Sequence, residues 1–136
     1  GSLSPSQFEQ WVIAPNARIA AAIHEARPGI PVIGFPKGAG EKLPRYAERT
    51  GVDAVGLDET IDPAWADSVL PKGLPVQGNL DPTFMHGSTE AAVNAAKAVL
   101  EAAGDEPGYI FNLGHGFAPS ARIECVEAVL RTVEGR

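Results

Sequence analysis

The sequence predicts an α/β protein built on a parallel β-sheet. Segments with helical periodicity alternate with short apolar runs, with roughly one such pair per 25 residues along the whole chain. The apolar runs are continuous rather than alternating, as expected for strands that are buried on both faces. Parallel strands joined by helical crossovers produce this order, so we expect four strands in one parallel sheet.

The first helix is predicted to begin after Ser4 and to continue to about residue 27. Ser4 can cap it, with Pro5 at the first helical position and Gln7 completing a capping box. Pro15 should kink or divide the helix, because it lacks a backbone donor and clashes with the preceding turn. The next apolar run, "PVIGF" at 31–35, predicts the first strand.

Two further units follow the same pattern. A helix is predicted over 41–50, where Gly51 fits a left-handed C-terminal cap, and a strand over 53–58. Asp62 is predicted to cap a helix over 63–70, because Pro63 stands at its first position. The third strand is predicted over 74–80.

The final part of the chain predicts two helices and one strand. Ser88 or Thr89 should start the longest helix, over 90–103, and Gly104 should end it. "GYIFNL" at 108–113 predicts the fourth strand. Ser120 is the expected cap of a last helix over 121–135, in which apolar residues recur at helical spacing.

Two architectures share this order of elements: a doubly wound open sheet and a (β/α)8 TIM barrel. A barrel typically needs about 250 residues, so four βα units amount to half of one. Each predicted strand is followed by a polar or glycine-rich cluster: "PKGAG", "DET", "GNLD" and "NLGHG". Because barrel active sites collect at the carboxyl ends of all the strands, this pattern favours a half barrel formed by residues 1–136 as one unit.

Composition limits the classes of function. The 136 residues carry a formal net charge of −6, and the absence of a basic cluster argues against nucleic acid as a partner. No apolar run reaches the roughly 18 residues that a membrane span needs. The single cysteine, Cys125, cannot form an internal disulfide or build a metal site alone. These features predict a cytoplasmic protein.

Four residues at the predicted strand ends are candidates for a functional site. His115 is the only histidine at a strand end, and it can bind a carboxylate or transfer a proton; equally, it can hydrogen-bond its own loop. Gly78 and Asn79 either line a ligand or belong to a turn, and Gly78 indicates a close approach of backbone or ligand. Gly38 fits an anion-binding nest or a tight turn. Asp58 more readily caps the loop that follows it.

The chain resembles the carboxyl-terminal half of the uroporphyrinogen decarboxylase family. The matching stretches are "LSPSQFEQWVIAP", "IPVIGFPKGAG", "TGVDAVGLD", "IDPAWA", "PVQGNLDP" and "YIFNLGHG". "QGNLDP" and "FNLGHG" together are the most specific. The sequence departs from the family where Glu59 stands in place of the usual aromatic residue, and again after "NLGHG".

The resemblance implies a cytoplasmic, homodimeric (β/α)8 lyase that needs no metal or organic cofactor. The family converts uroporphyrinogen III to coproporphyrinogen III in haem and chlorophyll biosynthesis by removing four acetate carboxyl groups. His115 matches the family's "NLGHG" histidine, which implies carboxylate binding or proton transfer. The other site residues belong to the amino-terminal half, so we expect this chain to be inactive alone.

Other partners and functions are also compatible with the sequence. An isolated half barrel should pair with the complementary half, associate with a second copy, or flatten into a doubly wound sheet, because open strand edges invite pairing. A non-catalytic module that binds an anion or a tetrapyrrole is the alternative from a different class. A cobamide-dependent methyltransferase of the same barrel family is a weaker alternative, because its zinc site needs more cysteines than this chain has.

Overall fold

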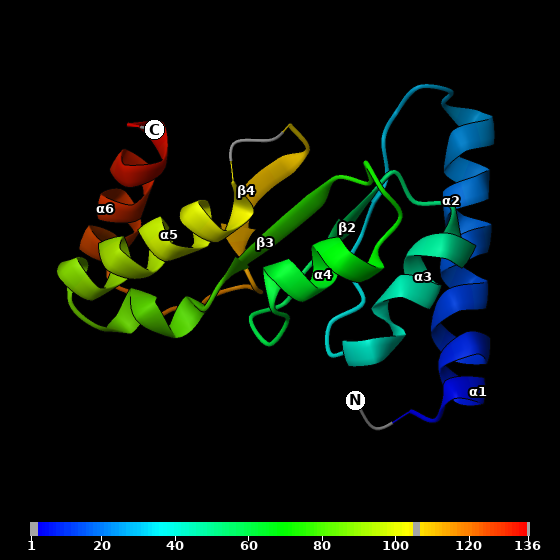
Figure 1. Ribbon diagram of the computed structural model, residues 1–136, viewed down its shortest axis with the longest axis horizontal. Helices are drawn as coiled ribbons and strands as arrows, with labels where there is room; N and C mark the ends of the chain where they lie inside the picture. Colours follow the sequence, from blue (N-terminus) through cyan, green and yellow to red (C-terminus); the bar gives the residue numbers. More distant parts are fainter. Residues whose placement is uncertain (1–2, 105–106, 136) are drawn as a thin grey trace.

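The computed structural model describes residues 3–104 and 107–135 (Figure 1). Its described strands form one parallel sheet in the order β1-β2-β3-β4, so neighbours in sequence are neighbours in space. They are β1 (Ile33–Gly34), β2 (Ala54–Gly56), β3 (Val76–Leu80) and β4 (Tyr109–Leu113). The predicted parallel α/β architecture is confirmed, although each strand is shorter than its apolar run. The order contains no reversal of the kind that creates a switch point in a doubly wound sheet.

The amino-terminal helix is divided as its proline predicts. It consists of α1 (Pro5–Phe8), a π-helical turn η1 (Glu9–Ile13) and α2 (Ala14–Ala26). Ser4 and Gln7 form the predicted capping box at its start. The Ala14 N–H donates to the Glu9 carbonyl, the wider spacing of a π turn. Pro15 follows directly, so the irregular turn lies where the missing proline donor leaves the backbone free to change pitch.

The remaining helices begin and end mostly at the predicted residues. Asp62 caps α4 through a hydrogen bond of 2.8 Å from the Ala64 N–H, and Ser88 caps α5 through one of 3.1 Å from the Ala91 N–H. Gly51 closes α3 in the left-handed region, at φ 69°. The elements are η2 (Gly40–Lys42), α3 (Leu43–Thr50), α4 (Pro63–Val69), η3 (Pro82–His86), α5 (Thr89–Ala103) and α6 (Ile123–Glu134).

The prediction that Ser120 caps the last helix is wrong. Helix α6 begins at Ile123, and its N-cap residue, Arg122, makes no side-chain capping hydrogen bond. The Arg122 N–H donates instead to the Met85 carbonyl at 2.8 Å, and its guanidinium donates to the Gly87 carbonyl at 2.9 Å. Tertiary contacts with the turn after β3 therefore set where α6 starts.

One face of the sheet is covered by helices. Along this face, Gly34, Val55, Val76 and Tyr109 are aligned by the strand register. Gly34 lies so close to α3 that a Cβ there would be 2.6 Å from the Tyr46 hydroxyl. The buried core divides into two clusters. The first comprises Phe8, Ile13, Ala20, Ala39, Leu43, Tyr46, Ala47, Val52, Val55, Leu57, Ile61, Ala66 and Leu70. The second comprises Leu80, Met85, Ala92, Ala96, Cys125 and Val129.

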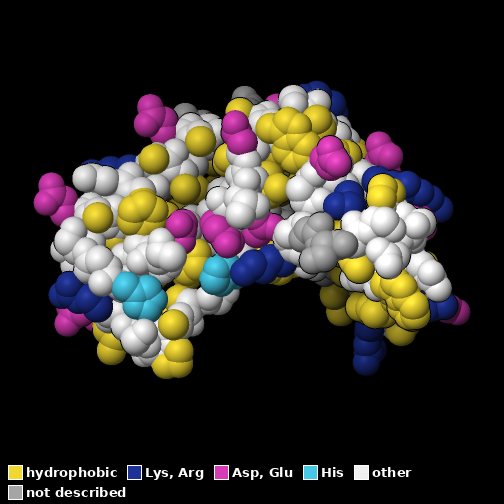
Figure 2. All heavy atoms as spheres, turned by 90° about the horizontal axis from the view of Figure 1, so that it is seen from below, with side chains coloured by type: hydrophobic (Ala, Val, Ile, Leu, Met, Phe, Trp, Pro, Cys, Tyr) yellow, Lys and Arg dark blue, Asp and Glu magenta, His cyan; other side chains and the backbone are white. Residues whose placement is uncertain are grey.

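The opposite face of the sheet is open. Its apolar side chains are well exposed: Ile33 at 41%, Phe35 at 46% and Ile110 at 43%. Figure 2 shows the molecule as an arch that is hollowed on one side. The outer helices also expose apolar side chains, with Trp11 at 66% and Ile123 at 72%. No described helix is both long and apolar enough to cross a bilayer.

Candidate functional site

The segment after β2 meets β3 and the loop after β4 at the carboxyl edge of the sheet because two glycines let the backbones come close. A Cβ on Gly78 would lie 2.5 Å from the Leu57 carbonyl oxygen, and one on Gly114 would lie 2.4 Å from the Glu59 backbone nitrogen. Real Cβ atoms do not approach so closely, so neither position accepts a larger residue without moving its neighbour. The close approach predicted at Gly78 is thus made by protein backbone. The Gly78–Asn79 peptide bond is cis.

Asp58 organises the loops that follow β1 and β2. Its carboxylate accepts hydrogen bonds from the Gly38 N–H at 2.7 Å, the Thr60 N–H at 2.9 Å and the Thr60 hydroxyl at 2.5 Å. Burial by itself raises the pKa of Asp58. The hydrogen bonds from Thr60 and Gly38, together with the charge of Lys37, outweigh burial and hold this pKa below its ordinary value. The expected role of Asp58 in capping the loop that follows it is confirmed by the bond from Thr60. Asp58 also binds Gly38 in the loop after β1, which was not expected.

Asn79 joins β3 to the loop after β2. Its side-chain amide donates to the Asp58 carbonyl at 2.9 Å and to the Ile61 carbonyl at 2.6 Å, and the residue is only 7% exposed. The neighbouring Gly78 carbonyl accepts a hydrogen bond from the Tyr109 hydroxyl. Both amide protons of Asn79 are therefore bound to the protein, as is the Gly38 N–H. This geometry fits residues that position the loops.

His115 lies after β4 and is one-third exposed. Its Nδ1 lies 2.6 Å from the Gly116 carbonyl oxygen, and its Nε2 lies 3.5 Å from Oε1 of Glu59. The Glu59 side chain is 22% exposed, and its Oε2 is buried without a hydrogen-bond partner among the described residues. The imidazole is held between a carbonyl on its own loop and a carboxylate on the loop after β2.

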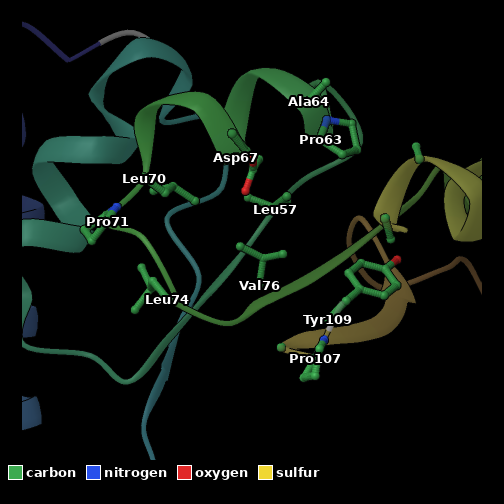
Figure 3. A pocket seen from close by; sticks show the side chains of 15 residues that line it. Leu57, Pro63, Ala64, Asp67, Leu70, Pro71, Leu74, Val76, Pro107 and Tyr109 are labelled. Carbon is green, nitrogen blue, oxygen red and sulfur yellow. The ribbon is translucent and has the colours of Figure 1, made fainter. Parts of the chain in front are cut away.

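A pocket of about 510 Å³ lies on the open face beside His115. It is lined by Phe35, Gly56, Leu57, Gln77, Asn112, Leu113, His115, Gly116 and Phe117. A second pocket, of about 590 Å³, lies on the opposite side of the sheet (Figure 3), where Leu70 and Pro63 of the α4 region face Tyr109 and Pro107. Only the first pocket contains a candidate site residue. The described residues hold no group of three potential metal ligands.

The structure collects the predicted residues Gly38, Gly78, Asn79 and His115 at one edge of the sheet, but only His115 lines the open-face pocket. Sequence reasoning missed Glu59 as a partner of the histidine. The sequence did hold a signal, because Glu59 stands where the resembled family usually has an aromatic residue. Distance along the chain concealed the pairing, because the two residues lie in loops that follow β2 and β4.

Comparisons with known proteins identify relatives along the whole chain. The family model for uroporphyrinogen decarboxylase (URO-D) matches residues 1–136. The chain is 57% identical over 135 residues to a uroporphyrinogen decarboxylase of Novosphingobium aromaticivorans, covering 99% of this chain and 39% of the relative. It is 59% identical over 133 residues to that of Erythrobacter litoralis, covering 98% of this chain and 39% of the relative.

A more distant relative gives the same result. The uroporphyrinogen decarboxylase of Rhodospirillum rubrum is 44% identical over 133 residues, which cover 98% of this chain and 38% of the relative. The chain therefore spans well under half the length of these curated relatives. Because the family model matches every residue, the chain belongs to the uroporphyrinogen decarboxylase family.

Proposed function

We propose that this chain forms part of a uroporphyrinogen decarboxylase, a carboxy-lyase that converts uroporphyrinogen III to coproporphyrinogen III in the cytoplasm. In each of four steps an acetate side chain loses carbon dioxide, and the carbon left behind takes up one proton to become a methyl group. Family membership supports the reaction. The observation that ties it to this structure is His115 on the wall of the open-face pocket, at the carboxyl end of β4.

We further propose that the four βα units form half of a (β/α)8 barrel. The sequential strand order and the helices on one face support this architecture. The exposed apolar residues Ile33, Phe35 and Ile110 on the open face are what the interior of an incomplete barrel would present. Exposed Trp11 and Ile123 on the first and last helices fit contacts with further helices of the ring. The complementary amino-terminal half is the proposed partner, and a second copy of this chain is the alternative.

In the proposed enzyme His115 binds a substrate carboxylate or assists proton transfer. Gly78 and Asn79 hold the chain segments around the pocket in place through their contacts with Leu57 and Asp58. Gly38 contributes by donating to Asp58. The pyrrole-binding and arginine groups expected from the family would come from the complementary half, which also explains how a chain of net charge −6 could serve an octacarboxylate substrate.

A chimaera tests this function. The chain replaces the matching 135 residues of the Novosphingobium aromaticivorans relative, and conversion of uroporphyrinogen III is followed by chromatography of the oxidised porphyrins. We expect decarboxylation by the chimaera, loss of at least about tenfold in kcat/KM on His115→Ala, and little change on His86→Ala, an exposed histidine outside the pocket.

Three results would argue against the proposal. A folded chimaera without decarboxylation would reject the assignment, and porphyrin binding by the same inactive chimaera would favour a non-catalytic binding module. Full activity of His115→Ala would reject the site. Activity of the 136-residue chain alone would reject the need for a complementary half.

A further inference from the structure

The contact between Glu59 and His115 joins two loops that the sequence separates by more than fifty residues. The Glu59 Oε1 atom lies 3.5 Å from Nε2 of the imidazole. The backbone contact between Gly114 and Glu59 holds these loops together. Within the described ranges, Glu59 is the only acidic side chain within 4.0 Å of a His115 nitrogen. The contact is therefore built into the packing of the site.

Both groups that face the nitrogens of the imidazole are hydrogen-bond acceptors. The Gly116 carbonyl, 2.6 Å from Nδ1, can only accept a hydrogen bond, so Nδ1 carries a proton. A carboxylate faces Nε2, and it also can only accept. A neutral imidazole has one N–H donor, whereas an imidazolium has two and also presents a positive charge to the carboxylate, 3.5 Å from Nε2.

Glu59 lies behind the histidine as seen from the pocket. His115 lines the open-face pocket, and Glu59 is absent from its lining. The Glu59 Oε2 atom is buried without a hydrogen-bond partner in the described part of the chain, so its charge depends on His115 for compensation. The imidazole is therefore the member of the pair that faces the pocket.

We propose that Glu59 is a positioning residue that holds His115 as an imidazolium on the pocket wall and so prepares it to bind a carboxylate. This assignment rests on the proposed function for the identity of the ligand, but the contact itself can be tested without it. Glu59 acts through His115 and does not touch the substrate.

The charge state of His115 is measured by ¹⁵N NMR of the histidine-labelled 136-residue chain at a pH near 6.5, the ordinary histidine pKa. The signals of the three histidines are assigned with His→Gln variants. We expect the ratio of doubly to singly protonated His115 to fall by up to about fivefold in Glu59→Gln. Glu127→Gln is the matched control, because it removes the same charge from an exposed pair with Arg131.

Glu59→Asp keeps the charge but withdraws it by one methylene, so a smaller fall is expected. This variant decides the question if Glu59→Gln does not fold. A ratio that stays constant or rises in the folded variants would overturn the proposal, since Glu59 would then not hold the proton on His115.

The chimaera provides the functional measurement. We expect Glu59→Gln to raise KM for uroporphyrinogen by up to about fivefold with kcat nearly unchanged, because the charged form of His115 that holds the bound substrate becomes less populated. An unchanged KM would overturn the role in carboxylate binding. An inactive parent chimaera would reject the proposed function, while the NMR ratio would still decide whether Glu59 sets the state of His115.

Discussion

Removing the Asp58 carboxylate, which binds two loops, should destabilise the chain far more than removing the carboxylate of Asp62, which caps helix α4. Asp58 is 3% exposed and accepts three hydrogen bonds from Gly38 and Thr60. A hydrogen bond to a charged group contributes about 1.5–3 kcal/mol, and bonds that share one acceptor do not add fully. We therefore expect Asp58→Ala to lower the free energy of unfolding by about 3–5 kcal/mol, because two backbone donors lose their acceptor.

Asp62→Ala is the matched comparison. Asp62 accepts a single, exposed hydrogen bond at the start of α4, and loss of such a cap costs about 1 kcal/mol. Urea unfolding followed by circular dichroism gives both values, and amide exchange at Gly38 should accelerate only in Asp58→Ala. Equal destabilisation by the two substitutions would refute the view that Asp58 clamps the loops after β1 and β2.

Two further predictions concern acid and helix capping. In the folded chain the pKa of Asp58 is lower than its ordinary value of 3.8. The ionised carboxylate therefore stabilises the fold above pH 3.8, and this contribution is lost as the pH falls through the pKa of the folded state. The free energy of unfolding of the unsubstituted chain and of Asp58→Asn is measured with urea from about pH 5 to about 2. The difference between the two should shrink as the pH falls, and a constant difference would contradict this prediction. Ser88→Ala should cost about 1 kcal/mol, whereas Ser120→Ala should be nearly neutral, since only Ser88 caps a helix; equal thermal shifts would contradict the observed start of α6.

The sequence predicted those features that depend on local chemistry. Ser4, Asp62 and Gly51 each satisfy a helix end with neighbours a few residues away, so their roles could be inferred from spacing. The start of α6 could not, because Arg122 is held by carbonyls of Met85 and Gly87 on a different turn. Strand lengths were overestimated for a related reason: an apolar run continues beyond the residues that find a partner strand.

The same distinction explains the candidate site. The alternation of helices and strands is sufficient to predict that His115 lies at the carboxyl edge of the sheet. Its contact with Glu59 depends on the close approach of Gly114 to the backbone of Glu59. A periodic pattern of apolar residues carries no information about such an approach. For Gly38 and Asn79 the sequence left a ligand contact and a turn both open, and in the structure their donors bind Asp58 and its neighbours. Glycine and amide residues at strand ends suit both purposes, so composition alone cannot separate them.

The division of the core into two clusters has a mechanical consequence. One cluster contains Val55 of β2 and has Val76 of β3 packed against it, whereas the other contains Leu80 at the end of β3 and has Phe111 of β4 packed against it. Asn79 precedes Leu80 of the second cluster and donates to the carbonyls of Asp58 and of Ile61, which belongs to the first cluster. A small rotation of one half against the other would change the separation of Glu59 from His115 while leaving each core intact. We expect the two amide hydrogen bonds of Asn79 to limit such a rotation.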